Sequence, residues 1–150
     1  MSFVLDESVE VNAPLDVVWA VITDLAAYGE WNPFVVLCRS TLRVGDPIDM
    51  RVKIFSRLAQ PQREYIQEHV PKTRLCYGLD GGRSGAVVSR RCHELEQLDA
   101  QRTSYRSHFV LSGWAAPLTR LLLGRRLQRG FHAMTIAIRA RAEQLQRDQR

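Results

Sequence analysis

The chain has 150 residues, of which 45% are hydrophobic and 25% charged, and its formal net charge is +5. This balance indicates one domain with its own core, and no run approaches the ~18 apolar residues that a membrane-spanning helix needs. Cys38, Cys76 and Cys92 are odd in number and far apart, which predicts free thiols in a reducing compartment, hence a cytoplasmic protein. We expect residues 1–146 to form the domain and residues 147–150 to be a disordered basic tail.

The first quarter of the chain predicts one strand and two short helices. Residues 3–11 alternate apolar and acidic side chains, as a half-buried strand does. Pro14 suits the first position of a helix, because its missing N–H would be unpaired there, so a helix is expected over 14–23. The mixed apolar and turn-rich residues 24–34 predict a second, shorter helix followed by a turn.

Six further strands are expected, because the apolar period becomes two from residue 35 onward. They are residues 35–42, 48–55, 63–70, 74–79, 87–98 and 103–113. If the turn between the last two pairs Asp99 with Gln101, three cross-strand pairs follow, namely Leu95 with Tyr105, His93 with Ser107, and Arg91 with Phe109. The odd-numbered residues of that hairpin then face inward.

The longest element is expected at 114–146, where apolar side chains recur at helical spacing and form one stripe. The stripe consists of Leu118, Leu121, Leu122, Leu127, Phe131, Met134, Ile138 and Leu145. The opposite face is basic, since residues 120–150 hold eight arginines against two acidic residues, a net charge of +6. So long a stripe must be buried against the strands. We therefore predict an α+β domain in which a seven-stranded antiparallel sheet wraps around a long C-terminal helix, with two short helices between strands 1 and 2.

Several motifs resemble the SRPBCC or START-like superfamily, the helix-grip proteins that include polyketide cyclases, lipid-transport proteins and relatives of the birch-pollen allergen. The resemblance is carried by VNAPLDVVWAVITDLAAYGEWNPF at 11–34, VGD at 44–46, PKTRLCY at 71–77, HELEQL at 93–98, and LSG at 111–113 leading into GFHAM at 130–134. It covers nearly the whole chain. These motifs mark turns, a helix start and packing positions, and none of them is catalytic.

The resemblance implies a cavity between the concave sheet and the long helix, used by relatives for lipids, sterols, polyketides, quinones and similar molecules. Tyr77 stands where the family often has tryptophan and His93 where an aromatic residue is usual, which suggests a more polar cavity. The candidate ligand-binding residues are Trp31, Phe34, Met50, Val52, Tyr77, His93, Tyr105, Phe109, Trp114, Phe131 and Met134. We expect non-covalent binding of a small apolar molecule.

An enzyme of the cyclase or dehydratase kind is the alternative. The candidate catalytic residues are His93, Tyr105 and Arg91, which fall on one face of the last hairpin and could polarise a bound polyketone. The four histidines show no metal-site spacing, so neither a metal nor another cofactor is expected. The paired acidic side chains that acid–base catalysis would use are missing from the inward faces, so binding is expected rather than catalysis.

Two other kinds of partner remain open. Leu121, Leu122 and Leu123 precede Arg125 and Arg126, and this combination of apolar and basic residues suits transient contact with an anionic membrane. A protein-interaction module would instead expose an apolar patch outside the cavity. A nucleic-acid partner is not expected, because the arginines are not interleaved with exposed aromatic residues.

The long helix also suggests a gate for the ligand. Gly124 and Gly130 interrupt it, so its first part is expected to bend or fray, and the 26–34 segment is expected to close over the same end. Alanine at either glycine should slow ligand exchange without loss of stability, provided that neither glycine is needed for close packing.

Overall fold

A computed structural model describes residues 2–55 and 57–150 of the chain. Within these residues, seven strands and four helical segments follow one another. They are β1 (Phe3–Val11), α1 (Leu15–Thr23), the 3₁₀ helix η1 (Leu25–Ala27), α2 (Tyr28–Trp31), β2 (Val35–Ser40), β3 (Pro47–Phe55), β4 (Leu58–Val70), β5 (Arg74–Gly78), β6 (Val88–Asp99), β7 (Arg102–Ser112) and α3 (Ala116–Asp148). This order is the predicted one, with short helices between the first and second strands.

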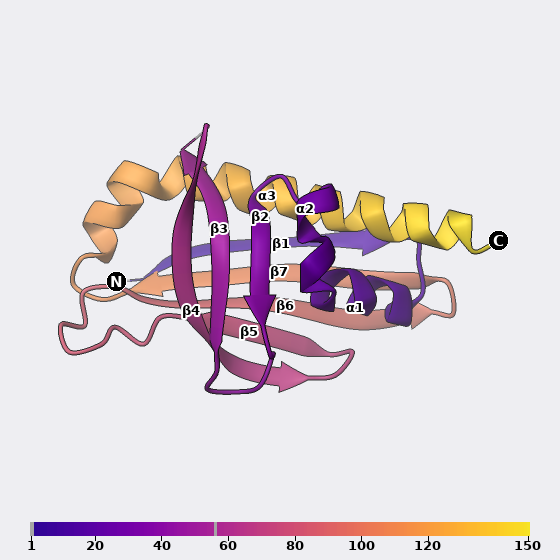
Figure 1. Cartoon of the computed structure of the whole chain (residues 1–150), viewed down its shortest axis with the longest axis horizontal. Helices are drawn as coiled ribbons and strands as arrows, with labels where there is room; N and C mark the ends of the chain where they lie inside the picture. Colours follow the sequence, from indigo (N-terminus) through magenta and orange to yellow (C-terminus); the bar gives the residue numbers. More distant parts are fainter. Residues whose placement is uncertain (1, 56) are drawn as a thin grey trace.

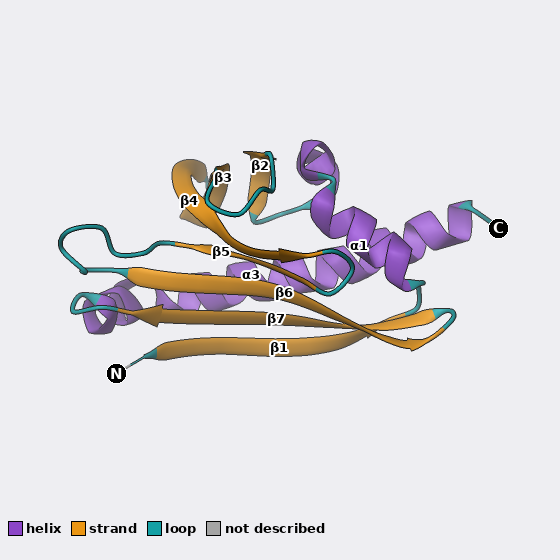
Figure 2. Cartoon of the chain, turned by 90° about the horizontal axis from the view of Figure 1, so that it is seen from below, coloured by secondary structure: helices purple, strands orange, loops and turns teal. Residues whose placement is uncertain are grey.

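The seven strands form one antiparallel sheet in the order β1-β7-β6-β5-β4-β3-β2. The sheet is strongly bent, so that β2, β3 and β4 cross the direction of β1, β6 and β7, and α3 runs along the concave side (Figure 1, Figure 2). Register shifts interrupt the β2–β3, β3–β4 and β4–β5 pairs, and such bulges increase local bending. The predicted α+β helix-grip fold is confirmed.

The three predicted cross-strand pairs of the last hairpin are confirmed, although its turn differs, because Asp99 pairs with Arg102 and not with Gln101, after a register shift between Gln97 and Asp99. Leu95 pairs with Tyr105, His93 with Ser107 and Arg91 with Phe109. The odd-numbered residues of β7 are buried, and so are Arg91, His93 and Leu95 of β6. Because side chains alternate across a strand, this register turns all three candidate catalytic residues toward α3.

The long helix begins two residues later than predicted and continues to Asp148. Gly113 has a φ of 99°, a left-handed conformation that lets the chain turn sharply from β7 toward the helix. Trp114 lies in that turn, where its indole Nε1–H donates to the carbonyl oxygen of Ser84 in the 79–87 loop, and its side chain is exposed. The buried stripe of α3 includes Leu127, Phe131, Met134 and Ile138, as predicted.

The two ends of α3 are anchored differently. Near its C-terminal end, Arg141 pairs with Glu30 of α2 at 2.8 Å, and Glu143 accepts a hydrogen bond from the backbone N–H of Asn12. Ile138 and Ala142 are fully buried there. Leu118, Leu121 and Leu122 of the first turns are exposed instead, although the predicted stripe included them.

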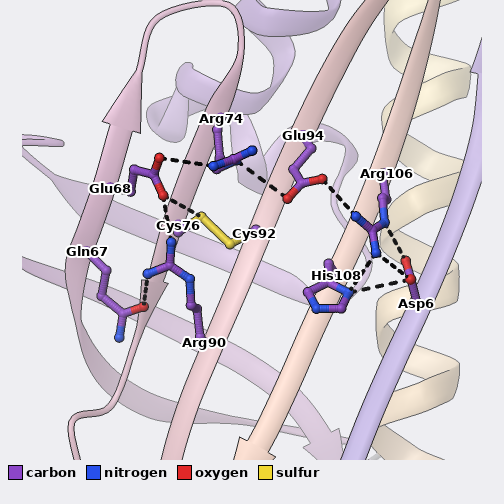
Figure 3. A network of polar contacts seen from close by, with 10 residues as sticks. All are labelled: Asp6, Gln67, Glu68, Arg74, Cys76, Arg90, Cys92, Glu94, Arg106 and His108. Carbon is purple, nitrogen blue, oxygen red and sulfur yellow. Dashed lines mark hydrogen bonds and ion pairs between the residues drawn. A yellow bond between two sulfur atoms is a disulfide. The ribbon is translucent and has the colours of Figure 1, made fainter.

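The convex face of the sheet carries a ladder of ion pairs that runs across five strands (Figure 3). Glu68 contacts Arg74 and Arg90, Glu94 contacts Arg74 and Arg106, and Arg106 also contacts Asp6. Each half-exposed pair contributes at most about 1 kcal/mol. The charged side chains of this ladder therefore already have partners within the sheet.

The expectation of three free thiols is wrong. Cys76 and Cys92 lie directly opposite each other on β5 and β6, with their Cα atoms 4.2 Å apart, and form a disulfide on the convex face (Figure 3). Only Cys38 is a free cysteine, and burial raises the pKa of its thiol to about 12. The sixteen-residue separation along the sequence concealed the pair, because only the sheet register brings the two together. The argument for a reducing compartment thereby loses its basis.

Candidate ligand-binding cavity

A cavity of about 190 Å³ lies between the concave face of the sheet and α3. Its lining is mainly apolar and comes from six strands and the long helix. Seven of the residues singled out from the sequence contribute to it, namely Phe34, Met50, Val52, Tyr77, Arg91, Phe109 and Phe131. The cavity is therefore where the resemblance placed it.

The cavity has a buried base and a partly open rim. Phe34, Met50 and Tyr77 at the base are each at most 5% exposed. Ile54 of β3, Leu79 and Val87 of the 79–87 loop, and Thr119 and Leu123 of α3 are only half-buried. The first turns of α3 thus form one side of the mouth.

Arg91 is the most unusual side chain in the lining. It is 3% exposed, and its guanidinium lies 4.2 Å from the centre of the Phe131 ring. Nη2 donates to the hydroxyl of Ser107 and Nη1 to the sulfur of Met134, both at 3.3 Å, whereas Nε has no partner. Among residues 2–55 and 57–150, no carboxylate forms an ion pair with it. A buried cation with so few acceptors is costly unless something else supplies negative charge.

Glu64 of β4 also lines the cavity, and the sequence reading missed it. Burial raises the pKa of its carboxyl, while the hydrogen bond from Gln62 and the charge of Arg91 act in the opposite direction. Glu64 has the same strand parity as buried Ile66, which was the available signal. The strand predicted over 63–70 already contained both residues, but the inward faces were expected to carry no acidic side chain, so Glu64 was not considered.

Behind the cavity wall, His93 joins two tyrosines in a hydrogen-bonded chain. Its Nε2 lies 2.9 Å from the hydroxyl of Tyr77, and its Nδ1 lies 2.7 Å from the hydroxyl of Tyr105. Burial, together with the charge of Arg91, holds the pKa of His93 well below its usual value, so the ring is neutral. One ring nitrogen therefore donates to one tyrosine hydroxyl, and the other ring nitrogen accepts from the second tyrosine. Burial raises the pKa of both tyrosines, which keeps them protonated.

The other sequence candidates lie outside the cavity lining. His93, Tyr105 and Met134 are fully buried behind it, so they support the wall without forming it. Trp31 packs edge-on against Tyr28 at the end of α2. Trp114 is 74% exposed on the outside of the molecule.

Alanine was expected to be tolerated at Gly124 and Gly130 only if neither glycine is needed for close packing, and this condition holds for Gly124 alone. A Cβ at Gly124 would lie 3.5 Å from the Phe3 ring, which is an ordinary contact. A Cβ at Gly130 would lie 2.2 Å from the Phe34 ring, so Gly130 is required for close packing. The expectation for alanine at position 130 therefore does not apply, because the Phe34 ring lies directly against the helix at this glycine.

Neither a metal site nor a membrane-spanning helix was found in the described part of the chain. No group of three His, Cys, Asp or Glu side chains is placed to hold a metal ion there. None of its helices is both long enough and apolar enough to cross a membrane.

Comparison with known proteins agrees with this geometry. Residues 2–143 match the family described as polyketide cyclase / dehydrase and lipid transport, and the chain belongs to that family. No curated protein sequence matches the chain.

The fold is shared with solved structures of low sequence identity. The Zhui aromatase/cyclase from Streptomyces sp. R1128 superposes with a TM-score of 0.78 at 16% identity, over 95% of this chain and 94% of that one. A START superfamily protein from Mycobacterium smegmatis gives 0.71 at 18% identity, over 95% and 98%. Norcoclaurine synthase from Thalictrum flavum, in complex with dopamine and hydroxybenzaldehyde, gives 0.68 at 12%, over 93% and 86%. This fold therefore occurs both in enzymes and in a protein named only by its superfamily.

Proposed function

We propose that the protein binds a small, largely apolar molecule without covalent chemistry, and that an acidic oxygen of this molecule lies opposite Arg91. The observation that supports this proposal is the buried guanidinium in the cavity wall, which has no carboxylate partner among the described residues. A charge-assisted hydrogen bond from an arginine is stronger than a neutral one. A bound acid would thus offset the cost of burying the cation.

The cavity volume limits the size of the molecule. An apolar protein cavity of about 150 Å³ is known to hold one benzene molecule. A cavity of about 190 Å³ therefore suits one substituted ring or a short chain. A larger fused-ring molecule would require the rim formed by Thr119 and Leu123 to move outward.

The test compares acids with alcohols of the same shape. Thermal unfolding is followed with benzoic and naphthoic acids, and with the corresponding aryl methanols as matched neutral controls. We expect the acids to raise the unfolding temperature more than the alcohols, because only the acids place a negative charge beside Arg91. A ligand present at about 100 times its Kd stabilises the folded protein by ~2.7 kcal/mol. The Arg91→Gln protein should lose this preference. An absence of stabilisation by either series, or a preference for acids that survives in Arg91→Gln, would contradict the proposal.

A cyclase- or dehydratase-like enzyme is the second candidate, and the hydrogen-bonded chain Tyr77–His93–Tyr105 favours it. Tyr77 lies between the cavity and His93, so its hydroxyl is the group of the chain that a substrate carbonyl could meet. In this candidate Tyr77 donates a hydrogen bond to the carbonyl and His93 orients it, while Arg91 stabilises the developing enolate.

One variant distinguishes a binding role from a catalytic role. The Tyr77→Phe protein keeps the ring and loses the hydroxyl. If the protein is an enzyme, turnover of a small β-polyketone should fall by about 10²–10⁴, the usual contribution of a proton donor, while binding is retained. If the wild-type chain shows no turnover, the catalytic candidate is excluded, and if Tyr77→Phe leaves a measurable turnover unchanged, Tyr77 is not the proton donor.

A further inference from the structure

The first turns of α3 expose large apolar side chains to solvent. Trp114 is 74% exposed, Leu118 59%, Leu121 81% and Leu122 65%. These four residues lie within nine positions of one another, at the start of the helix and in the turn before it. Figure 1 shows that these first turns curve away from the line of the rest of α3, so they project at one end of the molecule.

The same turns carry positive charge without counter-ions. Arg120, Arg125, Arg126 and Arg129 are exposed, and none of them forms an ion pair with any residue of the described ranges 2–55 and 57–150. On the convex sheet face, by contrast, Arg74, Arg90 and Arg106 are each paired with carboxylates (Figure 3). From Ala116 to Ala142, α3 contains no acidic residue.

The helix start adds to this excess of positive charge. The first turn of α3 has no side-chain cap and no acidic residue, so the positive end of the helix dipole is not compensated there. Negative charge supplied from outside at this end would therefore be favourable.

We propose that the first turns of α3 dock on an anionic lipid bilayer, with Trp114, Leu118, Leu121 and Leu122 entering the interface and the neighbouring arginines contacting the lipid phosphates. These turns combine exposed leucines with exposed arginines. Amphipathic helices that lie on a membrane surface have the same composition. Tryptophan is favoured at the level of the lipid head groups. Because no described helix is long and apolar enough to cross a membrane, α3 would lie on the surface.

The surroundings of these turns suit lipid contact further. An open groove of about 850 Å³ lies between them and the start of β1, and its lining includes Phe3, Pro117, Arg120, Leu121 and Arg125. Apolar and basic side chains thus alternate within one surface. Thr119 and Leu123 of the same turns form part of the cavity rim. Docking would place the cavity mouth beside the bilayer, but the docking itself does not require a bound ligand.

The experiment measures co-sedimentation of the full chain with vesicles. Vesicles of phosphatidylcholine alone are compared with vesicles of equimolar phosphatidylcholine and phosphatidylglycerol. We expect binding to the anionic vesicles only, and weaker binding at high salt, because exposed charges are screened. Each arginine near an anionic surface contributes about a fivefold increase in binding.

Two double variants provide a matched comparison of charge. Arg125→Glu with Arg126→Glu reverses two charges in the docking turns, whereas Arg147→Glu with Arg150→Glu makes the same change of net charge at the opposite end of the chain. We expect the first pair to weaken vesicle binding by at least about 25-fold and the second pair to have a much smaller effect. Equal effects of the two pairs would mean attraction by net charge alone and would overturn the proposal.

The apolar contribution is tested separately. Leu121→Ser should weaken binding to anionic vesicles, and Val44→Ser, at an exposed position in the β2–β3 turn, should not. The tryptophan emission should shift to shorter wavelength on binding, and this shift should be lost in Trp114→Phe. If the wild-type chain does not bind anionic vesicles, the membrane proposal is overturned, and an acidic protein becomes the partner to test.

Discussion

Arg91 is the residue on which binding and stability make opposite demands. Replacing Arg91 by Met removes a buried charge and keeps a flexible apolar chain beside Phe131, so we expect the free energy of unfolding to rise by on the order of 1 kcal/mol. The same change should abolish the preference for acidic ligands. Urea unfolding and calorimetric titration with benzoic acid measure the two effects. Arg91→Lys, which keeps the charge, should show no gain in stability.

The opposite outcome at this position would be equally informative. A loss of several kcal/mol in Arg91→Met would mean that the guanidinium acts mainly as a structural hydrogen-bond donor to Ser107 and Met134. The binding of a ligand anion would then not be the role of Arg91. The present geometry favours ligand binding, because Nε has no partner.

His93 should make stability depend on pH. Its pKa in the folded protein is held well below its usual 6.5 by burial, so the unfolded chain takes up a proton near pH 6.5 while the folded protein does not. The contribution of His93 is therefore fully present above pH 6.5 and is lost as the pH falls, by up to about 1.4 kcal/mol per pH unit. Urea unfolding between about pH 7.5 and about pH 5.5 measures this slope.

Two variants isolate the histidine from other titrating groups. His93→Gln should flatten this part of the pH dependence, because the amide does not titrate. Tyr77→Phe retains His93 and should keep the slope. If wild type and His93→Gln lose stability in parallel, then His93 is protonated within the fold.

At the scale of elements, the two glycines of α3 should respond in opposite ways to alanine. Gly124→Ala should raise the free energy of unfolding by up to about 1 kcal/mol, because the new Cβ meets only ordinary contacts and glycine disfavours helix. Gly130→Ala should lower it by about 1–3 kcal/mol, because the Cβ overlaps the Phe34 ring. Denaturant unfolding of both proteins measures the difference. A loss at both positions would contradict the assigned packing.

The clash at position 130 can be tested by relief. Phe34→Leu removes the edge of the ring that a Cβ at Gly130 would meet. The Gly130→Ala change should therefore cost less in a Phe34→Leu background than in the wild type. An unchanged cost would assign the effect to the helix backbone and not to Phe34.

The elements that could be predicted from the sequence are those whose signals are local. Strict alternation identified β3 and the last hairpin. The pairing of His93 with Ser107 was predicted correctly, although the expected turn was wrong, because a register shift between Gln97 and Asp99 offsets the different pairing of Asp99. The start of β4 was placed five residues late, because proline is unusual inside a strand, whereas Pro61 lies within β4, opposite Arg51.

Features that depend on contacts between distant segments could not be predicted. The disulfide between Cys76 and Cys92 follows from the β5–β6 register, which no local pattern determines. Trp114 was assigned to the cavity from the resemblance to helix-grip proteins, whereas it lies in the turn after Gly113 and is exposed. Strand alternation predicts which aromatic residues face α3, but not which of them line the cavity and which lie behind its wall. That division depends on packing between distant segments.

For the whole molecule, the two ends of α3 should differ in mobility. Its C-terminal half buries Phe131, Met134, Ile138 and Ala142, and Arg141 and Glu143 tie it to other elements. In the first turns, Leu118, Leu121 and Leu122 are exposed and Thr119 and Leu123 are half-buried at the cavity rim. Few buried contacts mean a low free energy of local opening. The first turns are therefore the part of the molecule best suited to open the cavity.

Hydrogen exchange tests this gate. We expect the amides of residues 118–123 to exchange faster than those of residues 131–145, and a saturating aryl acid to slow exchange at 118–123 while changing 131–145 little. Gly124→Ala should also slow exchange at 118–123 and lower the rate of ligand release, because it strengthens the helix beside the mouth. Arg147→Glu, at the other end of the same helix, should change neither rate. Equal protection along α3 would mean one rigid helix, and a ligand would then have to enter between Ile54 and the 79–87 loop without any movement of the helix.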